Sequence, residues 1–182
     1  MDALTIGLLA GLGAFTGFLS GLFGTGGGFL IVPMLALAGW PMVEAVGTSL
    51  TYVAIVGIGG AAHHLRTGNV DRRFALTAGL PAGLIAPLGV AASVQIPDAW
   101  LGLAFAGFLA LVASRMGKKP VEPAVPAPPP GTPQALGLGA AIGFLAGMFG
   151  VGGGVLAVPV QVAWLGVPIK RAVGNSLAIV LL

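Results

Sequence analysis

Two stretches of the chain carry nearly the same sequence and decide how it folds. The first reads GFLSGLFGTGGGFLIVP from Gly17 to Pro33, and the second reads GFLAGMFGVGGGVLAVP from Gly143 to Pro159. Twelve of their seventeen aligned positions are identical. A further pair follows, PMVEAVGTSL from Pro41 to Leu50 and PIKRAVGNSL from Pro168 to Leu177. Motifs shared in the same order and at nearly the same spacing indicate an internal duplication.

The composition around these repeats is that of a membrane protein. Of the 182 residues, 57% are hydrophobic and 7% are charged, whereas about a quarter are charged in an ordinary globular domain. A helix that crosses a bilayer needs about 20 apolar residues. Four uncharged runs reach that length, 3–43, 45–65, 74–97 and 123–169, and the run 99–114 falls slightly short. We therefore predict an all-α fold: a polytopic transmembrane helical protein with two homologous repeats, each containing a glycine-rich broken helix.

The charged and sulfur-containing residues exclude several classes of function. Eight Lys and Arg against five Asp and Glu give a net charge of +3, without the basic stripe and interleaved aromatics of a nucleic-acid-binding protein. The chain has no cysteine, which excludes a disulfide scaffold, a cysteine-ligated zinc site and a thiol nucleophile. No paired carboxylates and no Ser/His arrangement fall inside a predicted helix, so we expect no enzyme activity and no cofactor. The composition predicts the lipid bilayer as partner and no nucleic acid.

The chain divides into two transmembrane parts joined by a linker. Residues 1–115 form the predicted first transmembrane repeat. Its N-terminal apolar stretch is predicted to be a membrane helix and not a secretory signal peptide, because Asp2 stands where a signal peptide is basic. Residues 116–134, MGKKPVEPAVPAPPPGTPQ, are predicted to be a proline-rich cytoplasmic linker, since proline at this density favours extended polyproline II. Residues 135–182 start a second transmembrane repeat that stops five residues after Leu177. We expect this repeat to be incomplete by roughly 60 residues.

The basic residues predict which side of the membrane each loop occupies. One predicted loop, HHLRTGNVDRR, holds Arg66, Arg72 and Arg73, and the next basic stretch holds Arg115, Lys118 and Lys119. Two predicted helices, over 74–93 and 100–114, separate these stretches, so both lie on the same side. The positive-inside rule makes that side cytoplasmic. The three arginines of the loop would attract anions to the cytoplasmic mouth of the protein.

The two copies differ in the sign of one pair of residues. Lys170 and Arg171 belong on the cytoplasmic side, but the matching residues of the first copy are Val43 and Glu44. This reversal favours copies inserted upside down relative to each other, with the short segment 29–38 counting as a pass. Because ten helical residues cover only half of a bilayer, a re-entrant segment with parallel copies is the alternative.

The glycine clusters are the strongest chemical signal. Glycine beside apolar helix breaks the helix, because its backbone angles are permissive. Neither nucleotide motif fits: a phosphate-binding loop ends in GK[ST], and a dinucleotide-binding turn needs glycine where Phe29 and Val155 stand. Backbone amides at the start of the half-helices are then predicted to hold an anion, and glycines that only allow tight packing are the alternative. The cluster residues assigned to substrate binding are Gly24, Thr25, Gly26, Gly27, Gly28, Gly150, Gly152, Gly153 and Gly154.

Few polar features accompany the clusters in both copies. Pro33 and Pro159 each lie five residues past a cluster and leave a backbone carbonyl without its donor, which either coordinates a substrate or kinks the segment. The pairs Thr48–Ser49 and Asn175–Ser176 stand at the same place in both copies. Their hydroxyl and amide groups are predicted to donate to an oxyanion or, alternatively, to hydrogen-bond between helices.

Three more residues are candidates for gating or for attracting the substrate, namely His63, His64 and Arg66. Adjacent residues of a helix point about 100° apart, and no carboxylate lies at ligand spacing, so we expect no metal site. Histidines that cap a helix end at the membrane interface are one interpretation, and proton coupling or attraction of an anion is the other.

Together these motifs resemble the sulfite exporter TauE/SafE family of membrane permeases. The resemblance rests on GLFGTGGGFLIVPML, AVGTSL and the HHLRTGNVD loop in the first copy, and on GMFGVGGGVLAVPV with AVGNSL in the second. It implies an integral inner-membrane transporter of two homologous halves that moves sulfite, organosulfonates or related small sulfur-containing anions. It also implies that the glycine clusters, the two prolines and the two polar pairs are the family's motif residues.

Two hypotheses for function follow. The first is a secondary transporter whose small anionic substrate meets both broken helices near the middle of the membrane, and the family resemblance implies that it is an exporter. Because the chain has no nucleotide motif, an ion gradient or the substrate's own gradient supplies the energy. The alternative is a non-transporting or channel-like accessory subunit, which keeps the packing glycines but needs no two-fold site. A homo-oligomer is compatible with either.

Overall fold

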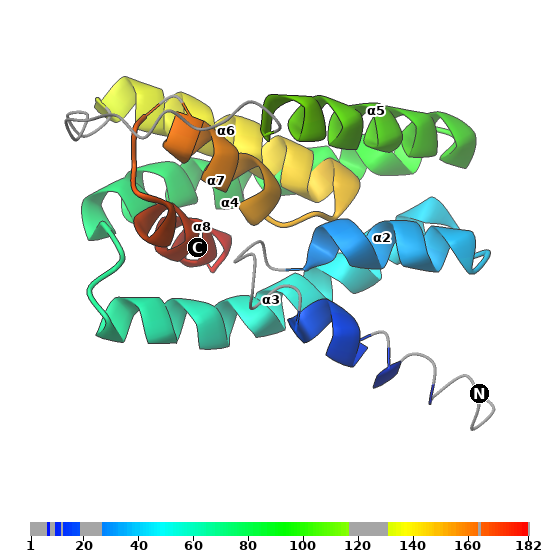
Figure 1. The fold of residues 1–182 in the computed structure, drawn as a ribbon. Helices are drawn as coiled ribbons and strands as arrows, with labels where there is room; N and C mark the ends of the chain where they lie inside the picture. The colour runs from blue at the N-terminus through cyan, green and yellow to red at the C-terminus, as the bar shows by residue number, and fades with distance from the viewer. Residues whose placement is uncertain are drawn as a thin grey trace.

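Helices form all of the regular structure in the part of the chain that the computed structural model describes, residues 7, 10–11, 13–18, 27–116, 131–163 and 165–181 (Figure 1). The predicted all-α fold is confirmed. The predicted first membrane helix lies largely outside these residues. The longer helices, in chain order, are α2 (Gly28–Leu37), α3 (Met42–Arg66), α4 (Arg72–Gln95), α5 (Asp98–Met116), α6 (Thr132–Phe149), α7 (Gly154–Ala163) and α8 (Ile169–Val180).

Three of the described helices are long and apolar enough to cross a membrane. By length and composition these are α3, α4 and α6, so the prediction of a polytopic membrane protein is confirmed. Two helices are much shorter, since α2 and α7 have ten residues each. At about 1.5 Å per residue, each covers half of a hydrocarbon core that is about 30 Å thick.

The loop between α3 and α4 is shorter than the sequence indicated. The predicted loop starts at His63, but α3 continues to Arg66, and the Thr67 N–H donates to the His63 carbonyl at 3.0 Å. The chain then turns at Gly68, whose φ of 72° is left-handed. The next helix starts at once, because the Asp71 side chain accepts the Phe74 N–H at 3.0 Å and caps α4.

The predicted linker, 116–134, is also helical at both of its ends. Met116 closes α5, and α6 begins at Thr132. Pro133 is compatible with this start, since the first turn of a helix needs no intrahelical donor. The Gly131 N–H donates to the Gln134 side chain at 3.2 Å and caps the same turn. Residues 117–130 lie outside the described part of the chain.

Small residues allow α4 and α6 to pack with their backbones in contact. Three glycines of α6 recur every fourth residue, and each would collide through an added β-carbon with the backbone carbonyl of an alanine on α4: Gly139 with Ala78, Gly143 with Ala82 and Gly147 with Ala86. This is the small-residue packing expected between membrane helices. Because α4 belongs to the first predicted repeat and α6 to the second, the contact joins the two.

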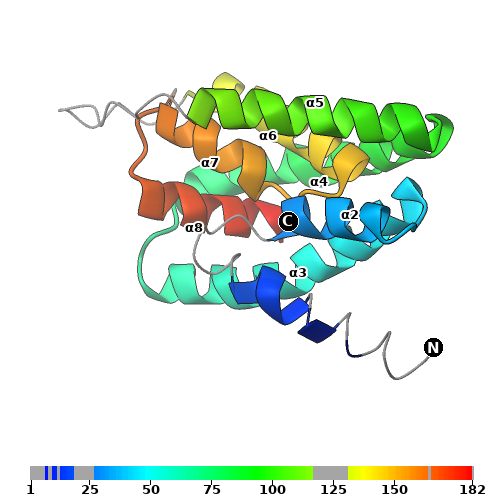
Figure 2. The same ribbon diagram turned by 45° about the vertical axis from the view of Figure 1, so that its right-hand side comes forward.

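The two short helices point in opposite directions (Figures 1 and 2). Both begin near the middle of the bundle, and α2 runs toward the start of α3 whereas α7 runs toward the start of α8. The helices that follow them, α3 and α8, also run antiparallel and lie side by side. A β-carbon on Gly57 would lie 3.5 Å from Val180, and one on Gly60 would lie 2.8 Å from Leu177. These contacts hold α3 and α8 against each other.

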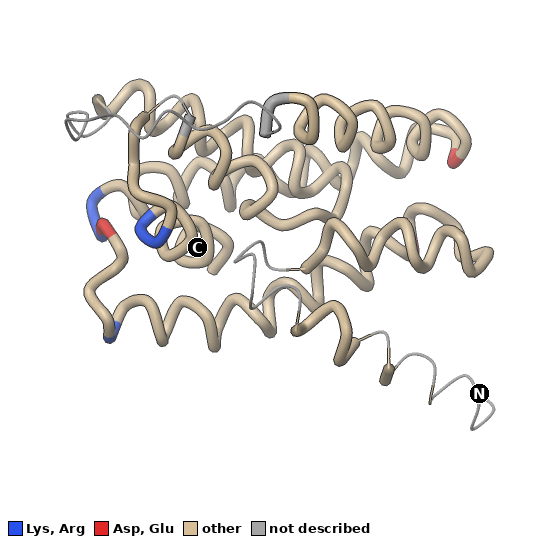
Figure 3. The backbone as a smooth tube through the Cα atoms, viewed as in Figure 1, with Lys and Arg blue, Asp and Glu red and all other residues tan. Residues whose placement is uncertain are grey.

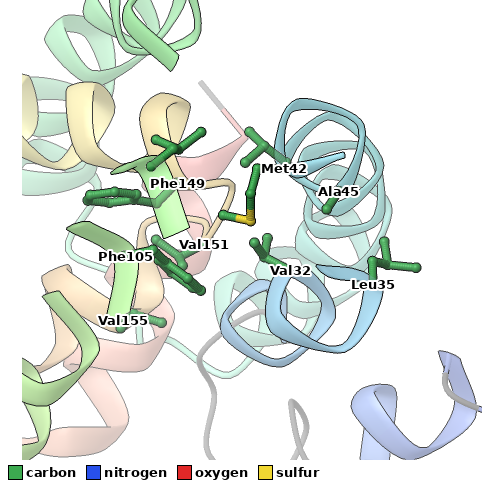
Figure 4. Close-up of a cluster of buried hydrophobic side chains, with 10 residues drawn as sticks. Val32, Leu35, Met42, Ala45, Phe105, Phe149, Val151 and Val155 are labelled. Carbon is green, nitrogen blue, oxygen red and sulfur yellow. The ribbon is translucent and has the colours of Figure 1, made fainter. Parts of the chain in front are cut away.

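A buried hydrophobic cluster surrounds the place where α2 and α7 begin (Figure 4). The ring of Phe149, at the end of α6, stacks on Phe108 with centroids 5.2 Å apart and contacts Phe105 at 5.5 Å. Side chains from both predicted repeats take part, namely Val32 and Leu35 of α2, Met42, Ala45 and Val46 of α3, Leu101 and Phe105 of α5, and Phe149, Val151 and Val155 around the second glycine cluster.

The described basic residues gather at one end of the bundle (Figure 3). There α3 ends with Arg66, α4 begins with Arg72 and Arg73, and α8 begins beside Lys170–Arg171. α5, which starts with Asp98, begins at the opposite end. The predicted placement of these five cations on one side is confirmed. The side chain of Arg115 and residues Lys118 and Lys119 lie outside the described part.

Candidate functional site

Among the described residues, the two glycine clusters meet at Gly28 and Gly150. A β-carbon added to Gly28 would lie 2.6 Å from the Gly150 carbonyl oxygen, and one added to Gly150 would lie 2.9 Å from the backbone of Val46. No real β-carbon tolerates such distances, so the approach requires glycine on both sides. The structure therefore brings together candidate residues of both copies. Gly24, Thr25 and Gly26 lie outside the described residues.

Left-handed glycines mark the ends of the broken helices. Gly150 closes α6 with φ of 68°, Gly152 follows with φ of 67°, and Gly27 precedes α2 with φ of 76°. Residues with a β-carbon rarely adopt such angles. The predicted break between α6 and α7 is thus confirmed. The first N–H groups of α2 and α7 have no partner within their own helices. Both helix starts are buried, and the helix dipole places partial positive charge at each of them.

The Ser49 hydroxyl ties the two clusters together. Ser49 lies on α3, is fully buried, and donates to the Gly150 carbonyl at 2.5 Å. The Gly28 carbonyl oxygen lies 3.3 Å from the same hydroxyl. A hydroxyl has a single proton, and the hydrogen bond to the Gly150 carbonyl uses it. Of the two interpretations of Ser49, the geometry favours interhelical hydrogen bonding, and Ser49 positions the clusters rather than offering a free donor.

Ser176, the matching serine of the second copy, has a free hydroxyl. Its side chain is fully buried, and its Oγ has no hydrogen-bond partner in the described part of the chain. The Ser176 carbonyl oxygen lies 3.8 Å from the place of a β-carbon on Gly153. Leaving a buried hydroxyl unpaired costs about 1–3 kcal/mol, so Ser176 is a candidate donor to a ligand beside the second cluster.

Asn175 is engaged in a buried network instead. Its side-chain amide donates to Gln161 Oε1 at 2.9 Å, and its Oδ1 accepts the Asp71 N–H at 2.7 Å. Gln161, fully buried on α7, in turn lies 3.4 Å from the Ala172 carbonyl, to which its amide donates. The network links α7, α8 and the turn before α4. Sequence reasoning missed Gln161, because a single glutamine inside an apolar segment carries no motif.

Thr48 and the two prolines lie apart from the glycine clusters. Thr48 is exposed on α3, on a different face from Ser49. Pro33 and Pro159 lie inside α2 and α7, half-buried, past the first turn of each helix. Tyr52 was not predicted: its hydroxyl is buried without a partner among the described residues, and it lies 3.4 Å from the place of a β-carbon on Gly17. The matching residue of the second copy is Ile179, so no repeated pattern indicates it.

The histidines lie in the last turn of α3, at the basic end of the bundle. Their rings meet edge to face with centroids 5.5 Å apart. His63 and Arg66 are exposed, whereas the β-carbon of His64 lies 3.2 Å from the place of one on Gly174 of α8. His64 therefore packs between α3 and α8. Among the described residues, no group of three His, Cys, Asp or Glu is arranged to hold a metal ion.

A cavity of about 490 Å³ opens beside the second cluster. Residues of α3, α4, α6 and α8 line it, together with Gly152 and Gly153. All of its lining residues are Gly, Ala, Val, Leu, Ile or Pro. Sequence reasoning missed the cavity because its walls come from four separate helices and include no polar side chain.

Comparison with known proteins gives one family. The family model described as sulfite exporter TauE/SafE matches residues 9–182. A probable membrane transporter protein of Methanocaldococcus jannaschii is 32% identical over 97% of this chain and 68% of its own length. A probable membrane transporter protein of Haemophilus influenzae is 32% identical over 91% of this chain and 65% of its own length. YunE of Bacillus subtilis, also named a probable membrane transporter protein, is 29% identical over 96% of this chain and 74% of its own length. The chain thus spans about two thirds of the first two relatives. No solved structure matches it.

Proposed function

Because this chain belongs to the sulfite exporter TauE/SafE family, we propose that it is a secondary transporter that exports a small sulfur-containing anion, sulfite or an organosulfonate, across the inner cell membrane. The chain is a multi-pass membrane protein. The observation that carries the proposal is the contact between Gly28, at the buried start of α2, and Gly150, at the break between α6 and α7, four residues before the buried start of α7.

Two helix starts in the middle of the bundle are a suitable place for an anion. Each half-helix covers about half of the hydrocarbon core, so helix starts that meet in the bundle lie near the midplane. Free N–H groups and the positive ends of two helix dipoles then face one region from opposite sides. Such pairs of broken helices, related by inverted repeats, are typical of the binding sites of secondary transporters. The opposite directions of α2 and α7 support inverted rather than parallel copies.

The charges at one end of the bundle support the direction of transport. Arg66, Arg72, Arg73, Lys170 and Arg171 surround that end, which the positive-inside rule makes cytoplasmic. Cations at a mouth raise the local concentration of anions by electrostatic attraction. The exposed Arg66 and His63 take this role, and the substrate enters from the cytoplasm.

The test is anion flux in vesicles that contain the purified protein. We expect sulfite or methanesulfonate to leave loaded vesicles faster than from vesicles without protein. Gly27→Ala, strained at φ of 76°, and Gly153→Ala, whose β-carbon would lie 3.1 Å from Val180, should abolish the flux while insertion is kept. Gly47→Ala, with open space around it, is the control. Unchanged flux in both variants would favour a channel-like or accessory subunit.

A further inference from the structure

The cavity of about 490 Å³ lies on the line of α8. Ile179 and Val180, in the last turn of α8, line one part of it. Because α3 and α8 are antiparallel and Gly57 lies opposite Val180, residues of α3 that precede Gly57 lie beyond the last turn of α8. Two of these, Leu50 and Val53, line the cavity as well. The cavity is therefore a groove that continues the path of α8 along α3.

The internal repeat predicts what fits opposite Leu50 and Val53. Two contacts hold α3 against α8, each between a glycine of α3 and an apolar residue of α8: Gly57 with Val180, and Gly60 with Leu177. The two residues of α8 match Val53 and Leu50, which stand 127 positions earlier in the first copy. Exchanging the two copies turns each contact into a second one. A helix in line with α8 would then place small residues against Val53 and Leu50.

The other wall of the groove is suited to a helix rather than to water. The lining residues that α4 and α6 contribute are mostly small, namely Ala82, Gly83, Ala86, Gly143, Ala146 and Gly147. Small residues let the backbones of membrane helices approach closely. None of the lining residues has a polar side chain, whereas a bound water needs two to four polar partners. A helix needs none, because its backbone groups bond to one another.

We propose that this cavity is the docking groove of an apolar transmembrane helix that lies in line with α8, runs antiparallel to α3 and turns small residues three positions apart toward Leu50 and Val53. The occupant is a further helical segment of the second repeat. The chain spans 68% and 65% of the lengths of the relatives from Methanocaldococcus jannaschii and Haemophilus influenzae, so those proteins have the length for such a segment. The proposal concerns assembly and does not depend on which anion is transported.

Disulfide formation with a peptide tests the groove and its direction. The probe is a synthetic peptide with the sequence of residues 55–66, IVGIGGAAHHLR, acetylated at its N-terminus so that no charge enters the groove. Its cysteine replaces the glycine that corresponds to Gly57 or Gly60. The purified full chain, which has no cysteine of its own, carries Val53→Cys or Leu50→Cys in mild detergent micelles.

The four pairings distinguish antiparallel from parallel docking. Antiparallel docking pairs position 53 of the chain with position 57 of the peptide, and position 50 with position 60, so we expect disulfides in these two combinations. The crossed combinations, 53 with 60 and 50 with 57, are displaced by three residues, about 4.5 Å along the helix, and should lose the disulfide because its geometry is strict. Disulfides only in the crossed combinations would show parallel docking and overturn the proposal.

Two controls separate docking from unspecific association in the micelle. Excess peptide without cysteine should abolish the disulfides, whereas a peptide with leucine at both glycine positions should not. Ala54→Leu in the chain narrows the groove and should also abolish them. Ala62→Leu, exposed on the same helix and away from the lining residues, should leave them unchanged.

The remaining outcomes would also overturn the proposal. Equal disulfide formation in all four pairings would mean that the peptide associates without a defined register. The absence of disulfides in all four, with chain and peptide in the same micelles, would mean that detergent or lipid fills the groove in preference to a helix. Neither result bears on anion flux, which is measured separately.

Discussion

The Ser49 hydroxyl donates to the Gly150 carbonyl at 2.5 Å, across 101 positions of sequence. The bond joins α3 of the first predicted repeat to the glycine break between α6 and α7 of the second. It fixes the distance between the two clusters, because the Gly28 carbonyl lies beside the same hydroxyl at 3.3 Å. The geometry of the candidate site therefore depends on one buried side chain that is not part of either glycine cluster.

Removing that hydroxyl should destabilise the protein. Ser49→Ala leaves the buried Gly150 carbonyl without its donor, and we expect the free energy of unfolding to fall by about 1 kcal/mol. Unfolding in mixed detergent micelles with increasing denaturing detergent measures the change. Thr51→Ala is the control, since its exposed hydroxyl bonds only to Gly47 in its own helix. A Ser49→Ala protein as stable as the control would show that the bond between the clusters is not needed.

The contact between the two clusters should not accept a β-carbon. Gly28→Ala places one 2.6 Å from the Gly150 carbonyl oxygen and 2.9 Å from Ser49 Oγ, and overpacking of this kind costs about 1–3 kcal/mol. We expect a lower melting temperature in detergent and loss of anion flux. Gly59→Ala on α3, with nothing within 4 Å, should melt at or above the temperature of the unaltered protein. Equal melting temperatures for the two variants would contradict the close approach.

The packing of α4 on α6 should depend on the glycines of α6. Gly143→Ala drives a β-carbon into the Ala82 carbonyl, so the helices must separate, at a cost of about 1–3 kcal/mol. Gly137→Ala, on the same helix with open space around it, should be neutral or stabilising, because alanine favours helix by about 1 kcal/mol over glycine. Thermal unfolding of both variants measures the difference. Equal stability of the two variants would contradict the backbone contact between α4 and α6.

The network around Asn175 should behave as one unit. Asn175→Ala and Gln161→Ala each remove the 2.9 Å hydrogen bond between these side chains, so their effects on the free energy of unfolding should overlap. A double-mutant cycle is expected to give a coupling of about 1 kcal/mol, within the range for hydrogen bonds between membrane helices. Additive effects would mean that the two side chains act independently.

The orientation of the bundle can be tested with single cysteines, because the chain has none of its own. Thr67→Cys places a thiol in the exposed turn at the basic end, and Ala99→Cys places one at the exposed start of α5, at the opposite end. A membrane-impermeant maleimide should label Cys at 99 in intact cells and Cys at 67 only after permeabilisation. The reverse pattern would place the basic end outside and contradict the positive-inside assignment.

The helices and the break between α6 and α7 could be predicted from the sequence, because both depend on local chemistry. Uncharged runs predict membrane helices, and Gly150 and Gly152 have the left-handed angles that only glycine adopts readily. The start of α6 was misplaced because proline in a first turn is compatible with helix.

The arrangement of the candidate site could not be derived in the same way. Ser49 and Ser176 occupy matching positions in the two copies, yet one hydroxyl is bonded to Gly150 and the other has no partner among the described residues. Thr48 and Asn175 also match, but Thr48 is exposed and Asn175 is buried against Gln161. These differences arise from contacts between residues far apart in the chain, which a repeated motif does not encode.

The central claim, an alternating-access transporter of a small sulfur-containing anion, is tested most directly by counterflow. Vesicles that contain the purified protein are loaded with unlabelled methanesulfonate and diluted into a trace of the radiolabelled anion. The account predicts a transient accumulation of label above its external concentration, because a carrier exchanges the anions one for one, and no such overshoot in the Gly153→Ala variant. Uptake that only reaches equilibrium would indicate a channel, and no uptake by inserted protein would contradict a transport function.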